Sequence, residues 1–200
     1  MAIKVANNNS LSAITALPAA VSGGAMTLLE TQTASSSATL SFTSNIDSTY
    51  DEYVFRFINM QSASTDVAFQ VNFRDGSTAY DATKTTTFFY AQHSEDDGTT
   101  ALSYLASRDE AQSSDAQHLT TNVGRTGSDS ASGYLHLFSP SSTTFVKHFM
   151  ARLSNHDTNG SEVDTFVSGY CNVTAAIDGV QFTMSSGNIT AGTIKLYGVS

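Results

Sequence analysis

The strongest alternation of apolar and polar positions runs from Gly133 to Leu153, GYLHLFSPSSTTFVKHFMARL. Side chains two residues apart in a strand point to the same face. One face of the second half is largely apolar, with Phe145, Lys147, Phe149, Ala151 and Leu153. The other face is mixed, with Val146, His148, Met150 and Arg152. A proline and three serines separate this half from a first run around Leu135 and Leu137, and they favour a turn. The pattern predicts a β-hairpin in the middle of an antiparallel sheet.

The same period of two residues recurs along most of the chain. Its cleanest example is the alternation of Val67, Phe69, Val71 and Phe73 with Ala68, Gln70 and Asn72. Further strands are predicted for residues 26–29, 31–44, 52–61, 83–93, 102–105, 119–123, 163–173, 177–184 and 193–199. Leu40 and Phe42 are expected to point inward, and Tyr53, Phe55 and Phe57 are expected to share one face of their strand. About eight to ten strands with turns between them are typical of a β-sandwich or jelly roll.

Turn residues and one short polar stretch separate these strands. Asp75-Gly76 is a hairpin dipeptide, and residues 185–188 are expected to form a hairpin-type turn. Residues 154–162 are expected to form a loop. Residues 107–117 are the only stretch with helix formers, for which we expect one or two turns over a sheet edge. The fold expected is all-β, an antiparallel β-sandwich with a jelly-roll-like character.

The chain is expected to hold one β-sandwich domain, residues 26–200, after an extended N-terminal arm, residues 1–25. Pro18 and Gly23-Gly24 interrupt regular structure in the arm. Its apolar anchors are sparse: Ile3, Val5, Leu11, Ile14 and Leu17. Such a segment buries too little to offset its backbone entropy alone. Two interpretations remain open: the arm packs back on its own domain, or a neighbouring protein orders it.

Charge and cysteine content exclude several classes of protein. The net charge is −9 without any Lys/Arg cluster, which argues against nucleic acid and anionic membrane as partners. No apolar run is long enough for a membrane span. The N-terminus lacks the cationic region and continuous apolar run of a signal peptide, so we expect none. The single cysteine, Cys171, lies in an apolar run and is interpreted as a small buried hydrophobe.

Candidate metal and catalytic residues are few. Glu95, Asp96 and Asp97 form an acidic loop that lacks the ligand spacing of a calcium loop, so a solvated turn is the preferred interpretation. No histidine pair has metal-ligand spacing; His136 and His148 are interpreted as a partly buried, hydrogen-bonded cross-strand pair. We expect neither a metal nor a cofactor.

Catalytic and sugar-binding signals are equally weak. The chain has no G-x-S-x-G nucleophile motif. The candidate carboxylates for a glycosidase are Asp109, Glu110 and Asp115, which lie in an expected surface segment. Tryptophan, common in sugar sites, is absent. Tyrosines near strand ends are the possible substitutes: Tyr50, Tyr80, Tyr90 and Tyr104. We therefore expect no enzymatic activity.

Four stretches carry a resemblance over almost the whole chain. They are MAIKVANNNSLSAITALPA, LLETQTASSSATLSFTSNIDSTYDEYVFRFINM, GYLHLFSPSSTTFVKHF and MSSGNITAGTIKLYGV. They resemble a family of short virion structural proteins encoded by marine tailed bacteriophages. The resemblance implies a particle protein without catalysis, located in the virion after synthesis in the host cytoplasm. It transfers no functional residues, because these motifs are strands and turns.

The function expected is a tail fibre or tail-tip component that presents a β-sandwich for assembly and host-surface contact. The first alternative is a capsid decoration protein on the phage head. The second is a polysaccharide-degrading virion enzyme, which a cleft with two close carboxylates would favour. The expected partners are further copies of the chain, with a trimer preferred, other virion proteins, and a host surface glycan. Receptor-binding residues are left unassigned.

Overall fold

The computed structural model describes residues 25–124 and 127–200, which form two antiparallel sheets packed face to face. The larger sheet runs, in spatial order, through β1 (Met26–Thr33), β13 (Ile189–Val199), β3 (Glu52–Ser62), β9 (Ala131–Phe138), β10 (Lys147–His156), β11 (Ser161–Cys171), β5 (Lys84–Ser94) and β6 (Thr100–Tyr104). β7 (Ala111–Ser113) also pairs with β5. The smaller sheet runs through β2 (Leu40–Phe42), β12 (Gly179–Met184), β4 (Phe69–Arg74) and β8 (Gln117–His118). The prediction of an all-β antiparallel sandwich is confirmed.

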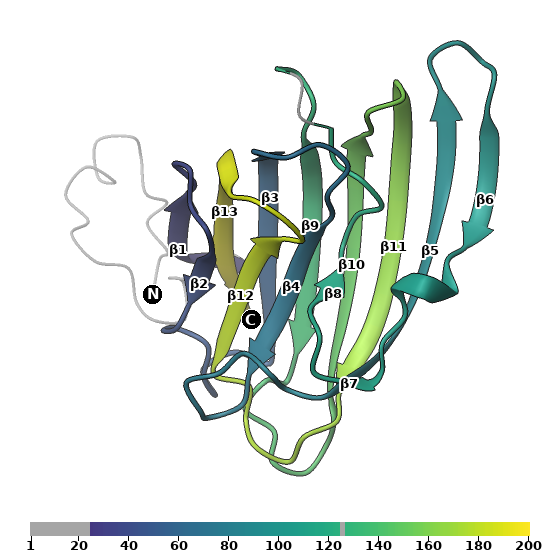
Figure 1. Cartoon of the computed structure of the whole chain (residues 1–200). Coiled ribbons are helices and arrows are strands. Elements are labelled where there is room, and N and C mark those ends of the chain that lie inside the picture. Colours follow the sequence, from purple (N-terminus) through teal and green to yellow (C-terminus); the bar gives the residue numbers. More distant parts are fainter. Residues whose placement is uncertain (1–24, 125–126) are drawn as a thin grey trace, which may run out of the picture.

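The two sheets differ in size, nine strands against four. In Figure 1 the smaller sheet lies in front of the part of the larger sheet between β1 and β10, and β11, β5 and β6 extend past it to the right. The segment between β6 and β9 covers this side. Its residues Gln117, Leu119 and Thr120 are fully buried, and the Thr165 hydroxyl of β11 donates to the Leu119 carbonyl at 2.7 Å. The larger sheet therefore has one inner face that is almost completely covered.

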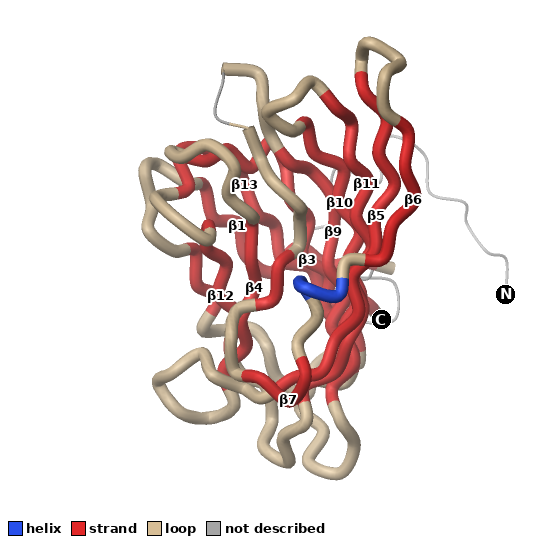
Figure 2. Tube along the Cα trace, turned by 45° about the vertical axis from the view of Figure 1, so that its right-hand side comes forward, coloured by secondary structure: helices blue, strands red, loops and turns tan. Residues whose placement is uncertain are grey.

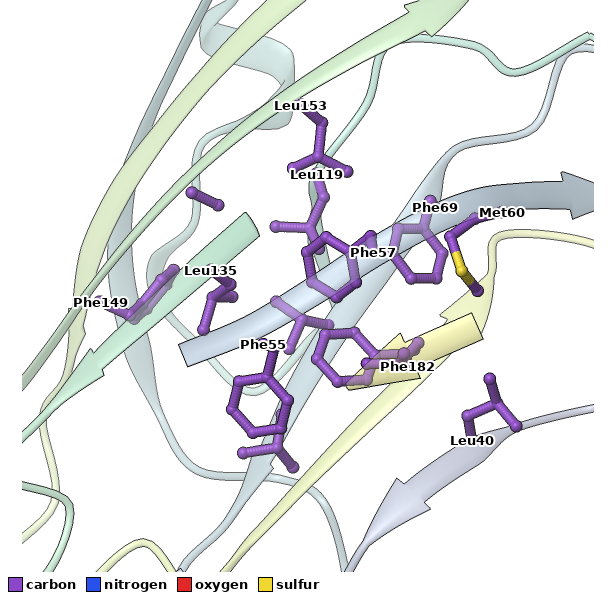
Figure 3. Close-up of a cluster of buried hydrophobic side chains, with 14 of the residues drawn as sticks. Leu40, Phe55, Phe57, Met60, Phe69, Leu119, Leu135, Phe149, Leu153 and Phe182 are labelled. Atoms are coloured by element: carbon purple, nitrogen blue, oxygen red, sulfur yellow. The ribbon is translucent and has the colours of Figure 1, made fainter. Parts of the chain in front are cut away.

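Phenylalanines fill the space between the sheets. Figure 3 shows Phe55 and Phe57 of the larger sheet beside Phe69 and Phe182 of the smaller one. The ring of Phe182 lies 5.1 Å from that of Phe57 and 5.7 Å from that of Phe69, centroid to centroid. Strands that alternate in sequence place these rings on one face, because every second residue of β3 and β4 points inward. The inward positions expected for residues 40 and 42 are confirmed, and the face that residues 53, 55 and 57 share is the buried one.

The hairpin predicted between Gly133 and Leu153 is present as β9 and β10 at the centre of the larger sheet. Phe149 pairs with Leu137, and Leu153 with Gly133. Phe149 is fully buried and packs on Phe73 of the smaller sheet at 4.9 Å. Phe145 departs from the expected pattern: it precedes the strand, in the loop, and is 74% exposed. Phe145 fits the two-residue period of β10, but no neighbouring strand extends far enough to bury its side chain.

Two lysines of the inner face are buried beside Cys171. Register places Cys171 between Lys147 of β10 and Lys84 of β5. The Lys147 ammonium donates to the Val173 carbonyl and that of Lys84 to the Asp115 carbonyl, each at 2.5 Å. Burial lowers the pKa of both lysines and raises the pKa of the Cys171 thiol to about 12. The interpretation of Cys171 as buried is confirmed, although its neighbours include charged groups.

Two expected hairpin turns connect strands that do not pair. Asp75-Gly76 follows β4, which pairs with β12 and β8, whereas β5 pairs with β11. Residues 185–188 lead from β12 in the smaller sheet to β13 in the larger one. Both predictions of hairpins were wrong for one reason: turn residues specify a local change of direction but not the sheet that the next strand joins.

Three other expectations need correction. Residues 107–117 hold, instead of one or two helical turns, the end of a 3₁₀ turn, η1 (Ala106–Arg108), and then β7. Figure 2 shows η1 as the single helical segment of the described chain. Residues 119–123 form no strand and contribute one bridge, Val123 to Val67. Most of residues 154–162 belong to β10 and β11, with a tight turn around Asp157 rather than a long loop.

Candidate functional site

The face of the larger sheet that points away from the smaller sheet, called the outer face, carries a row of aromatic and basic side chains. The alternation in β5, β10 and β11 that buries Phe88, Ala151 and Val167 turns their neighbours outward. Register then aligns one residue from each strand across the sheet. This aromatic–arginine row consists of Tyr104, Phe89, Phe166, Arg152, Tyr134, Arg56 and Lys195.

The centre of the row is held by ring and charge contacts. The Phe89 and Phe166 rings are parallel, with centroids 4.8 Å apart. The Arg152 guanidinium lies 4.9 Å from the Phe166 centroid, a cation–π distance. Arg152 also donates two bonds to Asp164, Nε to Oδ1 at 3.0 Å and Nη2 to Oδ2 at 2.7 Å. The hydrogen bond with Asp164 raises the pKa of Arg152. Half of the Arg152 side chain remains exposed and available to a partner.

Two hollows lie on the row and a third lies beside it. The first, about 310 Å³, is lined by Phe89, Tyr134, Met150 and Phe166. The second, about 430 Å³, shares Met150 and continues to His148 and Tyr170. The third, about 300 Å³, shares Tyr134 and Arg152 with the first and continues to Glu162 and Asp164. Met150 is 56% exposed between the first two. Together the three hollows form a continuous uneven surface on the outer face, lined by aromatic, methionine and charged side chains.

The histidine pair expected on the hairpin does not form. His136 lies opposite Met150, not His148. The His136 ring bonds through Nδ1 to Glu52 of β3, and it stacks on Phe138. His148 lies edge-on to Tyr170 of β11, with centroids 6.0 Å apart. The expectation was wrong because two residues equally far from a loop in sequence need not be paired once the register is fixed.

The acidic loop joins β5 to β6, and its side chains close the turn. Asp96 Oδ1 accepts from the Ser94 hydroxyl at 2.6 Å and from the Gly98 N–H at 2.9 Å. These hydrogen bonds lower the pKa of Asp96. Asp97 lies 3.0 Å from the ring of His93. Among the residues that the structure describes, no group of three or more His, Cys, Asp or Glu side chains is arranged to hold a metal ion.

A second charged group lies at the end of the β10–β11 hairpin. His156 Nδ1 is 2.7 Å from Asp129, and its Nε2 is 3.4 Å from Glu95 of the acidic loop. Partial burial disfavours the imidazolium, but the two carboxylates outweigh this and raise the pKa of His156. The contact ties the acidic loop to the neighbouring hairpin.

The candidate carboxylates are spread along the segment after β6. Asp109 accepts the Phe88 N–H at 2.8 Å and also bonds the Tyr104 hydroxyl, so it fastens β5 to β6. The Glu110 N–H donates to the Thr86 hydroxyl. Asp115 offers its carbonyl to the buried Lys84. Each carboxylate oxygen of Asp109 accepts a hydrogen bond from within the fold. These two bonds are enough to explain the position of Asp109.

The four candidate tyrosines occupy separate places. Tyr104 belongs to the aromatic–arginine row. Tyr80 lies under Arg74, 6.0 Å from the ring centroid to the guanidinium carbon. Tyr50 lines a hollow of about 470 Å³ with Asp51 and Glu52. Tyr90 lines a polar hollow of about 270 Å³ on the inner side of the sheet. The structure does not gather them into one sugar-binding site.

The polar groups of this inner hollow are occupied by the protein itself. Asp157 accepts from the Asn159 and Ser161 N–H groups, at 2.8 and 2.9 Å. Gln92 donates to the Ser161 hydroxyl. Arg108 lies 3.2 Å from the ring of His118. Most of the polar groups named here therefore already have partners within the protein.

The arm residues Ile3, Val5, Leu11, Ile14 and Leu17 lie outside the described residues. Sequence reasoning placed Phe89, Phe166 and Arg152 on strands but did not single them out as a surface. Alternation alone shows that they point outward. Their alignment depends on β5, β11 and β10 lying side by side, and the whole row depends on the order of seven neighbouring strands, which no local pattern states.

Comparisons with protein-family models, with curated proteins and with solved structures find no match to this chain. Within the described ranges, no helix is long and apolar enough to cross a bilayer.

Proposed function

We propose that the chain is a non-enzymatic structural subunit of a tailed-phage particle, placed in the tail fibre or tail tip. In this proposal the outer face of the larger sheet contacts a neighbouring particle protein or the host surface. The observation that carries the proposal is the aromatic–arginine row with its three adjoining hollows.

The composition of this surface supports a contact function. Phe, Tyr, Met and Arg are the residues enriched at protein interfaces, whereas Lys, Glu and Asp are depleted there. The outer face gathers Phe89, Phe166, Tyr134, Met150 and Arg152 on a chain that is acidic and poor in charged residues elsewhere. Large apolar side chains left exposed together mark a binding surface more often than a solvated one.

The arm is proposed as the anchor to the particle. Burial of one apolar anchor such as Leu11 against a neighbour contributes roughly 1.5–3 kcal/mol before ordering entropy is included. Ordering each residue of the arm costs about 1–2 kcal/mol. Binding to the particle would supply the contacts that the arm cannot make among its own residues.

The proposal is tested in purified particles. Antibody labelling and quantitative mass spectrometry should find the protein in the particle, in few copies on the tail. Hundreds of copies on the head would instead support the capsid decoration alternative. Absence from particles would contradict the proposal outright.

Two variants separate the arm from the outer face. Deletion of residues 1–25 should abolish incorporation and leave the melting temperature of the soluble protein nearly unchanged. Met150→Glu places a charge between two hollows and should reduce contact through the outer face. Ser186→Glu, in the exposed turn after β12, is the matched control and should incorporate normally. If the truncated chain unfolds or still incorporates fully, the anchoring role is wrong.

The enzyme alternative has its own experiment. Pure protein is incubated with host surface glycans and the products are separated by size. We expect no release of oligosaccharides. Reproducible release that disappears when Asp109, Glu110 or Asp115 is replaced by its amide would establish the polysaccharide-degrading alternative.

A further inference from the structure

The two long edges of the larger sheet differ in how they are protected. One edge is β1 and the other is β6, at the far right of Figure 1. A free edge presents unpaired backbone groups, and proteins that stay monomeric interrupt it with bulges, charges or proline. β1 has such an interruption, because its register with β13 shifts between Leu28 and Glu30. Its Glu30 places a charge directly in the edge strand.

β6 carries none of these devices. Its sequence is Thr-Ala-Leu-Ser-Tyr, without charge or proline. Its register with β5 is continuous from Thr100 to Tyr104. Leu102 is 77% exposed and Tyr104 is 60% exposed. The edge is therefore regular, uncharged and apolar, the combination that favours pairing with another strand.

Hydrogen bonding shows which groups of β6 are open. The Leu105 N–H donates to the Phe88 carbonyl, and the Ser94 N–H donates to the Thr99 carbonyl. Hydrogen-bonded pairs alternate along an antiparallel ladder. The N–H and C=O groups of Ala101 and Ser103 consequently point to β5, and those of Thr100, Leu102 and Tyr104 point outward. Within the described chain, no hydrogen bond reaches these outward groups.

We propose that β6 pairs with β6 of a second copy of this chain, antiparallel and about a two-fold axis at Leu102. Leu102 then faces Leu102 of the second copy, and Thr100 faces Tyr104, each as a hydrogen-bonded pair. The two sheets continue into one. A two-fold contact uses the same surface on both copies and closes on itself.

The charges near β6 select the antiparallel direction. The acidic loop, Glu95 to Asp97, precedes β6. A parallel pairing would bring the two acidic loops together at one end, where they repel each other. The antiparallel pairing separates the two loops by the length of the strand. The inference deepens the proposed function, on which it rests for its setting in a particle, by naming a second copy as partner.

Cross-linking tests the pairing directly. Residues in a hydrogen-bonded antiparallel pair have Cα atoms about 5.5 Å apart, which suits a disulfide. Leu102→Cys should form a disulfide-linked dimer under mild oxidation. Thr87→Cys is the control and should not form one: Thr87 is exposed on the same face, but it lies on β5, one strand inward from β6 and beyond the paired stretch. Cys171 is buried and should not react in either variant. Failure of Leu102→Cys to cross-link at high protein concentration would overturn the inference.

Sedimentation of the full chain gives a second test that needs no new bond. The wild type should dimerise as its concentration rises, and Leu102→Lys should raise the dissociation constant of the dimer at least tenfold. Leu28→Lys makes the same change at the β1 edge and should leave this dissociation constant unchanged. A monomer at every concentration, or an oligomer that Leu102→Lys leaves intact, would show that β6 is not the contact. Either result would overturn the β6 contact alone. The proposed function is decided by a different experiment, the detection of the protein in purified particles.

Discussion

The inner and outer faces of β10 are built from alternate residues of one strand but serve different purposes. Lys147, Phe149, Ala151 and Leu153 point inward and are buried, whereas the residues between them are exposed. Inward residues touch several strands of both sheets, so a change there affects the whole fold. Outward residues such as Met150 touch mainly their neighbours on one face. The comparison teaches that stability and surface chemistry are set by separate residues, which leaves the outer face free to specialise.

Truncation of an inward residue should have the largest effect. Phe149→Ala removes a ring packed between β10 and Phe73 of the smaller sheet and should lower the free energy of unfolding by about 3–5 kcal/mol. Met150→Ala, one residue further along the strand, should lower it by less than about 0.5 kcal/mol. Urea unfolding of both variants measures the difference. Equal losses would break the distinction between the two faces.

A pH titration sharpens the comparison at the edge of the smaller sheet. Burial, with a contribution from nearby Arg108, lowers the pKa of His118 from 6.5 to about 4. As pH falls below about 6.5, His118 becomes protonated in the unfolded chain but stays neutral in the folded one. The free energy of unfolding therefore decreases between pH 6.5 and 4. By pH 5 the loss from this group should be about 2 kcal/mol.

The variant His118→Gln isolates this contribution. It should remove that part of the pH dependence, seen in melting temperatures from pH 7.5 to 5. His93→Gln, on the exposed side of β5, is the matched control and should keep it. His156 acts in the opposite sense, because its raised pKa gives stability below pH 6.5 that is lost as pH rises. An unchanged profile in His118→Gln would mean that His118 is accessible to protons in the fold.

The smallest effect is expected on the aromatic–arginine row. Arg152→Ala removes an exposed ion pair and a cation–π contact, and it should lower the melting temperature only slightly, because solvent screens both interactions. Thermal melts at low and high salt measure the cost, and the difference from wild type should shrink with salt. A loss comparable to that of Phe149→Ala would show that the outer face is part of the structural core.

Sequence patterns predicted the strands whose two faces have different surroundings. β3, β4 and β10 alternate because one face of each meets the core and the other does not. The short strands β7 and β8 have no such signal, since two or three residues cannot show a period. Residues 107–117 therefore read as a helix, although tertiary pairing with β5 and β4 decides their conformation.

The candidate site was harder to predict than the strands. Each residue of the aromatic–arginine row is readable as outward-facing from its own strand. Their assembly into a row requires the pairing of β3 with β9 and of β11 with β5, which join residues far apart in the chain. Turn dipeptides such as Asp75-Gly76 gave no information on these partners, because β4 and β5 enter different sheets.

The position of β13 between β1 and β3 sets an order on folding. The hairpins β9–β10 and β10–β11 join neighbours in sequence and can close on the timescale of microseconds. β1 pairs only with β13 and must wait for it, whereas β3 can pair with β9 earlier. Contacts of such long sequence separation slow folding and keep strand edges unpaired meanwhile. A nascent chain in which β13 is not yet complete should therefore be a substrate for chaperones, with its central hairpins formed, β1 unpaired and one edge of β3 still open.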